Sequence, residues 1–128
     1  MLTIRLDGRR VHDIASFYDE INRVFMTGVD WQLGPSLDAL DDMLHGGFGA
    51  LHEVTEARVI WEHHAEAAAA LGVEPTRDQL LAKLEDPRFD QTIARRKLER
   101  LEAEGGPTYF ETVLEVFADH PRIELVLA

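Results

Sequence analysis

Gly34-Pro35-Ser36-Leu37-Asp38-Ala39-Leu40-Asp41-Asp42-Met43-Leu44 is the most informative segment of the chain. The hydroxyl of Ser36 is of the kind that caps helix N-termini. Gly46-Gly47 is of the kind that ends helices. Apolar residues recur between these two signals at helical spacing. The segment therefore predicts a short helix from Ser36 to about His45.

The leucines and the acids of this helix fall on opposite sides when residues are placed about 100° apart. The side that holds Leu37, Leu40 and Leu44 is expected to be buried. Asp38 and Asp42 lie one turn apart on the other side, and Asp41 lies at the flank. The pattern alone leaves two interpretations open, a solvated surface and a surface that presents paired carboxylates to a partner.

Three short apolar segments, at residues 2–6, 58–61 and 123–127, have the composition or alternation of strands. Helical patterns lie between them, at about 13–26, 62–71, 76–85, 87–104 and 107–119. Helical crossovers between short strands indicate a parallel sheet. We therefore expect a single α/β domain over residues 1–128, with a small three-stranded parallel sheet covered by five or six helices. Residues 72–104 are predicted to be a helical insertion.

Local signals also suggest where individual helices begin. Ser16 with Asp19 fits a capping box for the first helix, and Asp13 is an alternative cap. Thr76-Arg77-Asp78-Gln79 fits a capping box for a later helix. Pro107 suits the first turn of the helix that follows it.

The chain of 128 residues has 24 acidic and 13 basic residues, which gives a net charge of −11. This charge argues against direct binding of nucleic acid and favours a basic protein as the partner. The charge is uneven, because residues 24–57 hold six acids and neither Lys nor Arg. No apolar segment is long enough for a membrane helix. No signal peptide is visible at the start, so we expect a cytoplasmic protein.

The absence of cysteine excludes disulfides, thiol catalysis and cysteine-based zinc sites. Asp38 with Asp42 could be an acid–base pair, but a short exposed helix gives no reason for the raised pKa that catalysis needs. We therefore expect no enzymatic activity. Glu62-His63-His64 with Glu66 could bind a metal, although surface histidines on an Ala-rich helix are the simpler interpretation. No metal or cofactor is expected. A small metal-dependent hydrolase that uses the histidines stays as an alternative function.

Residues 34–44 resemble the signature of the barstar family, in which a glycine, a polar helix start and Leu-Asp-Ala-Leu precede a further acid. Residues 6–11 are similar to the first strand and turn of that family, and residues 16–18 to the start of its first helix. Residues 111–117 and 123–127 resemble its last helix and strand. The resemblance covers about residues 1–61 and 107–128 and implies an intracellular protein inhibitor of a basic, secreted-type ribonuclease.

The resemblance implies a role for several residues in partner binding. Asp38 and Asp42 match the two helix acids, and Asp42 matches the one that enters the phosphate site of the ribonuclease. Asp119 matches a further contacting acid, and Gly34 matches the glycine of the binding loop. The same surface is expected to include Trp31 and Asp41. The sequence departs from the family pattern at several positions: Gln32-Leu33 replace loop aromatics, Trp31 is shifted by one step, Ser36 replaces Asn, Asp41 replaces an aromatic, and Gly46-Gly47 offers no aromatic after the helix.

Two further features have simpler interpretations. Arg95-Arg96-Lys97 with Arg100 is expected to be a solvated helix face, with Ile93, Leu98 and Leu101 directed inward. Trp31 and Trp61 are expected to be packing residues, although an exposed Trp31 would suit an interface. The alternative function, of the same fold, is an acidic interaction module that binds another basic protein.

Overall fold

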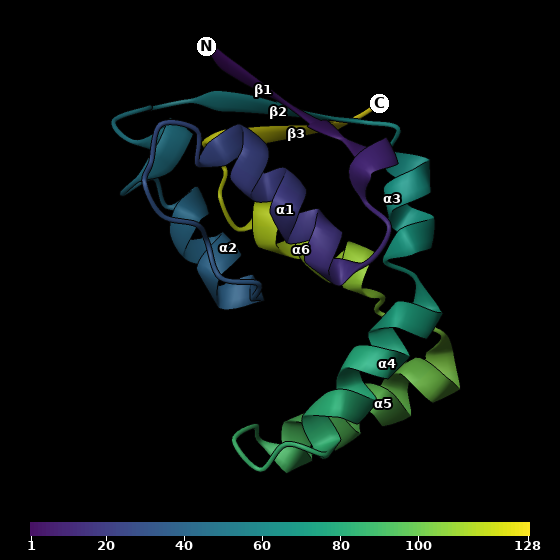
Figure 1. Cartoon of the computed structure of the whole chain (residues 1–128). Coiled ribbons are helices and arrows are strands. Elements are labelled where there is room, and N and C mark those ends of the chain that lie inside the picture. The colour runs from purple at the N-terminus through teal and green to yellow at the C-terminus, as the bar shows by residue number, and fades with distance from the viewer.

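A parallel sheet of three strands forms one layer of the molecule in the computed structural model, which describes residues 1–128 (Figure 1). The strands are β1 (Leu2–Asp7), β2 (Ala57–Glu62) and β3 (Ile123–Leu127), in the spatial order β1-β2-β3. Ile4 pairs with Val59, and Val59 pairs with Leu125. The predicted α/β fold with a three-stranded parallel sheet is confirmed.

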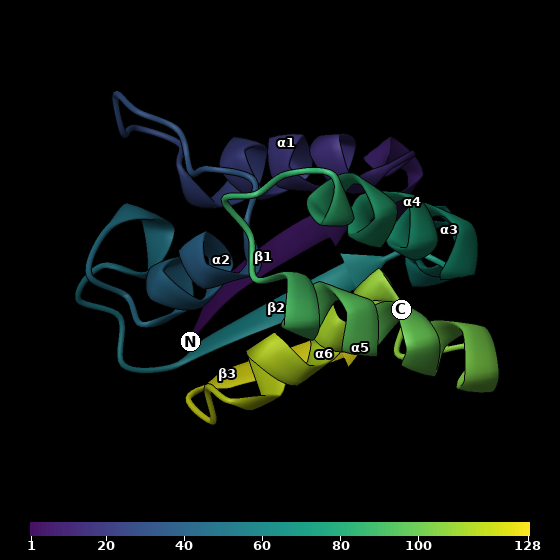
Figure 2. The same cartoon turned by 90° about the horizontal axis from the view of Figure 1, so that it is seen from below.

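The sheet is covered on one face, because the helices lie on the same side of it (Figures 1 and 2). Side chains alternate accordingly, and Leu6, Val59 and Trp61 are buried. The outer face carries ion pairs between neighbouring strands instead, Arg5 with Glu62 and Arg58 with Glu124. Most parallel sheets are buried on both faces, so this polar outer face explains why the strands alternate rather than read as apolar runs.

Six α-helices complete the fold. They are α1 (Ile14–Phe25), α2 (Leu37–Leu44), α3 (His64–Ala70), α4 (Val73–Leu84), α5 (Gln91–Glu104) and α6 (Tyr109–Ala118). Two 3-10 turns lie at Gly8–Arg10 and Gly49–Leu51. A cluster of 23 buried apolar residues joins the sheet to α1, α2, α3 and α6. No helix is long and apolar enough to cross a membrane.

The first helix begins at the alternative cap. The Asp13 carboxylate accepts a hydrogen bond from the backbone N–H of Ser16 at 2.7 Å, and the Ser16 hydroxyl accepts one from the Asp13 N–H. The two residues therefore form a reciprocal capping box. The pairing of Ser16 with Asp19 was the wrong choice, because Ser16 already lies in the first turn.

Helices α4 and α5 form an antiparallel hairpin that extends away from the sheet (Figure 1). The hairpin occupies the residues for which the sequence predicts an additional helical segment. Its buried apolar residues, Leu80, Ala94 and Leu101, lie outside the main core cluster. Ile93 is 52% exposed, so the expectation that it points inward is wrong. Leu101 is buried as predicted.

The hairpin is joined to the core at its base by buried hydrogen bonds. Thr76 lies inside α4, where its hydroxyl donates to the Gly72 carbonyl and accepts from the Tyr109 N–H at 2.8 Å. The predicted helix start at Thr76 is therefore wrong. The Tyr109 hydroxyl is 2.6 Å from that of Tyr18 on α1, so Tyr109 links α1, α4 and α6.

Helix α6 begins at Tyr109, two residues later than the predicted start at Pro107. Its cap is Thr108, whose hydroxyl accepts from the Glu111 N–H at 3.2 Å while the Glu111 carboxylate accepts from the Thr108 N–H at 2.9 Å. Pro107 precedes the cap and is not in the first turn. Glu111 is therefore used in holding the helix start rather than standing free on its surface.

Candidate protein-binding surface

Helix α2 forms where the sequence predicts it. The Ser36 hydroxyl accepts a hydrogen bond from the Ala39 N–H at 3.1 Å, which confirms Ser36 as the N-cap. Leu40, Met43 and Leu44 are completely buried. The helix packs against α6, and this contact fixes which side of α2 remains in solvent.

Asp38 and Asp42 are both exposed on α2. Asp119, the residue that ends α6, is exposed as well. None of the three carboxylates forms an ion pair within the chain. Asp119 directly precedes His120, which contacts Asp41 on α2. We call the surface formed by Asp38, Asp42 and Asp119 the acidic surface.

The loop before α2 is held to α1 by one side chain. The Asn22 amide oxygen accepts from the Leu33 N–H at 2.7 Å, and its NH₂ group donates to the Leu33 carbonyl at 3.3 Å. Leu33 is buried, and Gly34 follows it into solvent. No local pattern singles out Asn22, because its partner lies eleven residues away.

Gly34 has open space around it, and a Cβ atom there would meet nothing within 4 Å. Its backbone also avoids the left-handed region. The fold therefore does not require glycine at this position. Any requirement for it would come from a partner that approaches the backbone closely.

Trp31 is 47% exposed and rests on Phe48, with ring centroids 4.9 Å apart. The loop before α2 and the turn after it thus contact each other. Trp31 packs on one face and offers the rest of its surface to solvent. Trp61, in contrast, is fully buried as expected.

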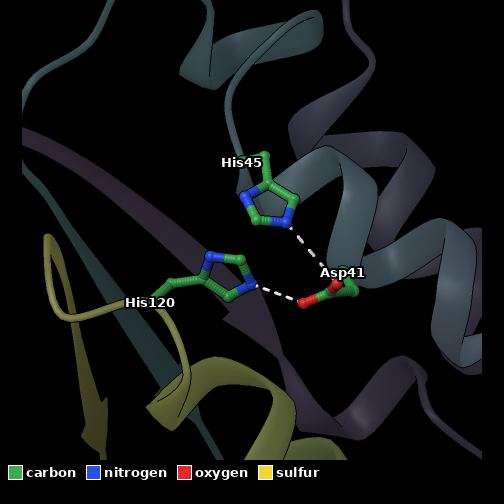
Figure 3. Close-up of side chains that lie close together, drawn as sticks. All are labelled: Asp41, His45 and His120. Atoms are coloured by element: carbon green, nitrogen blue, oxygen red, sulfur yellow. Dashed lines mark hydrogen bonds and ion pairs between the residues drawn. The ribbon is translucent and has the colours of Figure 1, made fainter.

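Asp41 lies between the acidic surface and the core. One carboxylate oxygen is 2.7 Å from Nε2 of His120, and the other is 3.6 Å from Nε2 of His45 (Figure 3). The His120 side chain is only 6% exposed, whereas that of Asp41 is 42% exposed. The sequence did not reveal this group, because 79 residues separate Asp41 from His120.

Arg122 holds the C-terminal end of α2. Its guanidinium donates to the carbonyls of Leu44 at 2.8 Å and of Val54. A cation at this end of a helix is favourable, because the carbonyl groups there carry partial negative charge. Gly46 allows this approach, since it has a positive φ of 88° and a Cβ atom there would lie 2.2 Å from the Arg122 side chain.

Asp38 also borders a cleft between the start of α2 and the α4–α5 hairpin. The cleft has a volume of about 550 Å³ and is lined by Lys83, Phe89 and Lys97 as well as Asp38. Burial holds the pKa of Lys83 below its usual value, Lys97 adds to this effect, and Asp38 opposes it. Lys97 therefore faces this cleft rather than belonging only to a solvated face.

Glu111, Glu115 and Asp119 are spaced four residues apart on α6 and its C-terminal end, but this row of acids is only partly free. Glu111 caps α6, and Glu115 lines a smaller cleft with Lys97 and Arg100 of the hairpin. Asp119 alone keeps the open position expected of it. The free negative charge is thus concentrated at Asp42 and Asp119, and Asp38 shares its surroundings with lysines.

The fold and this surface define a small α/β protein in which a short acidic helix is presented on one side. The family model Barstar (barnase inhibitor) matches residues 1–90. The chain therefore belongs to the barstar family, as its sequence motifs suggested. The match includes α2 and α4 and ends before α5. None of the curated proteins compared with the chain matches it.

Proposed function

We propose that this protein is a cytoplasmic inhibitor of a basic, secreted-type ribonuclease and that α2 with its preceding loop blocks the active site of the enzyme. The observation that carries this proposal is the pair Asp38 and Asp42, exposed one turn apart and free of ion pairs. Membership of the barnase inhibitor family supports the target class.

The chemistry follows from what a ribonuclease must bind. Its active site holds phosphate groups with Arg, Lys or His side chains. A carboxylate in a phosphate position accepts strong, charge-assisted hydrogen bonds from the same donors. The net charge of −11 also accelerates the encounter with a basic enzyme, and salt weakens this attraction.

Asp42 is proposed to contribute more than Asp38. Asp38 lies beside Lys83 and Lys97 in the cleft, so part of its charge is already balanced within the chain. Asp42 borders none of the clefts. A cationic partner therefore gains more from reaching Asp42.

The remaining residues have supporting roles in this proposal. Trp31 supplies an exposed aromatic surface, and Gly34 lets the partner approach the loop backbone. Asp119 adds charge at the edge. Asp41 reaches the partner only with the exposed part of its carboxylate, because His120 occupies one oxygen.

Inhibition of RNA cleavage by a barnase-type ribonuclease tests the proposal. The unaltered protein should abolish cleavage at equimolar concentration. Asp42→Ala should weaken inhibition by about 10- to 100-fold, the range expected when a hydrogen bond to a charged group is lost. Asp38→Ala should have a smaller effect in the same direction.

Asp19→Ala is the matched control, because Asp19 is an exposed acid on α1 and the substitution removes the same charge. It should leave inhibition within about twofold of the unaltered protein. Equal effects of Asp19→Ala and Asp42→Ala would contradict the proposed surface. Equal binding of unrelated basic proteins, without inhibition, would instead identify a general acidic interaction module.

A further inference from the structure

Asp41, His45 and His120 bring three metal-ligand side chains together at the border of the acidic surface. Asp41 and His45 lie one turn apart on α2, and His120 comes from the turn that follows α6 (Figure 3). One ligand atom from each residue lies within 4.8 Å of the other two. Two residues spaced i and i+4 on a helix can bind one ion from the same face.

Two distances between these ligand atoms lie on either side of the ligand–ligand distance that a small divalent ion requires. Four ligands at about 2.0–2.1 Å in a tetrahedron lie about 3.3 Å from one another. Nε2 of His120 is 2.7 Å from one oxygen of Asp41, and Nε2 of His45 is 3.6 Å from the other. Both distances are close to that ligand–ligand distance, and an ion would replace the hydrogen bond between His120 and Asp41.

The burial of the three side chains suits a site that is fixed on one side and open on the other. The buried His120 is held in place by the core, and the His45 side chain is 65% exposed. The two imidazole rings meet edge to face, with centroids 4.7 Å apart. His120 reaches Asp41 by a hydrogen bond, and His45 reaches the other oxygen of the same carboxylate from one turn further along α2, so both Nε2 atoms converge on Asp41.

We propose that Asp41, His45 and His120 bind a divalent ion of the zinc class, with the fourth position open to water or to a ligand from a partner. Two imidazoles and one carboxylate suit Zn²⁺, Co²⁺ or Ni²⁺, whereas Ca²⁺ and Mg²⁺ prefer oxygen ligands. A bound divalent ion adds positive charge at the border of the acidic surface. It also ties the C-terminal half of α2 to the end of α6.

Titration of the full chain with ZnCl₂ in a calorimeter tests this site. One ion per chain should bind, and saturating zinc should raise the Tm by about 4 °C or more, because only the folded state holds the three ligands together. His45→Ala should weaken binding by about tenfold or more. It removes an exposed side chain, so the apo protein should unfold at nearly the same temperature.

Asp41→Asn and His52→Ala separate this site from other sources of binding. Asp41→Asn keeps the size of the side chain and should also weaken zinc binding. His52 lies 3.7 Å from Glu53 without a third ligand, so His52→Ala should leave binding unchanged. Absence of zinc binding to the unaltered chain, or binding that survives His45→Ala and is lost in His52→Ala, would overturn the proposal. The group would then be a hydrogen-bonded pair with a neighbouring histidine.

This test is independent of the ribonuclease assay, because it requires no partner. Zinc binding without inhibition would leave the metal site standing and remove the proposed function. Inhibition without zinc binding would support the proposed function and remove the metal site.

Discussion

The sheet with its packed helices and the α4–α5 hairpin are held together by different forces. The main cluster of 23 buried apolar residues contains none from residues 72–108. The hairpin buries three apolar side chains of its own and adds ion pairs, among them those of Arg77 with Glu74 and Glu102. Burial of apolar surface dominates folding stability, and exposed ion pairs add little. The hairpin should therefore open locally while the core stays folded.

The largest effect is expected for Leu6→Ala near the C-terminal end of β1. Leu6 is 1% exposed within the main cluster, so the substitution leaves a cavity in a rigid core. The free energy of unfolding should fall by about 3–4 kcal/mol. Chemical denaturation followed by circular dichroism measures this value.

Leu101→Ala on α5 makes the same change at the same exposed fraction, 1%. If the hairpin opens separately, the free energy of global unfolding should fall by about half as much or less. Amide hydrogen exchange should become faster in α4 and α5 and stay unchanged in β1 and β2. Equal losses for Leu6→Ala and Leu101→Ala would show that core and hairpin unfold as one unit.

Tyr18→Phe acts where the core meets the base of the hairpin. It removes the buried hydroxyl that lies 2.6 Å from the Tyr109 hydroxyl. The expected loss is about 1 kcal/mol at neutral pH. Thermal unfolding monitored at two probes, one in the sheet and one in α5, should show earlier melting of the hairpin.

The same tyrosines predict a decline of stability in alkali. Burial raises the pKa of Tyr18 well above its usual value of 10.0, and burial also raises that of Tyr109. Their contribution is complete below about pH 10 and is lost as the pH rises further, because the unfolded chain then releases these protons more easily. Tyr18→Phe should make this decline shallower, and an unchanged slope would contradict the assignment.

The smallest effects are expected for one ion pair in each region. Arg77→Ala removes the link from α4 to Glu102 on α5, and Arg58→Ala removes the pair with Glu124 across the outer face of the sheet. Each should lower the Tm by about 1–2 °C, and 1 M NaCl should erase both differences. A much larger loss for Arg77→Ala would show that ion pairs, rather than the few buried leucines, hold the hairpin.

The sequence predicted the elements whose patterns are local. Alternation identified β1 and β3, the apolar and β-branched composition of residues 58–61 identified β2, and Ser36 with the leucines that follow it identified α2 and the exposure of Asp38 and Asp42. The sequence misplaced the start of α4, because threonine is a residue type that commonly caps helices. The preceding Gly72 takes that place, and the Thr76 hydroxyl is needed by Tyr109, 33 residues away. A local pattern contains no information on that partner.

For the acidic surface, too, local patterns predicted the exposed residues but not the long-range contacts that position them. Helical phasing located Asp38 and Asp42 without the structure. The attachments that orient α2 could not be predicted. Asn22 holds Leu33, in the loop before α2, across 11 residues, and His120 and Arg122 hold α2 itself across 79 and 78 residues. The lysines beside Asp38 were equally invisible, since they reach it only when the hairpin folds back toward α2.

The attachment of α2 to Arg122 and His120 also has a consequence for timing during synthesis. Residues 37–44 leave the ribosome long before α6 and β3, yet their helix has neither its packing partner nor its C-terminal cation until those later segments emerge. An isolated helix of eight residues is unstable in water. The acidic helix should therefore take its final orientation only near the end of translation. Until β3 pairs with β2, the paired carboxylates of a nascent chain are not yet in place.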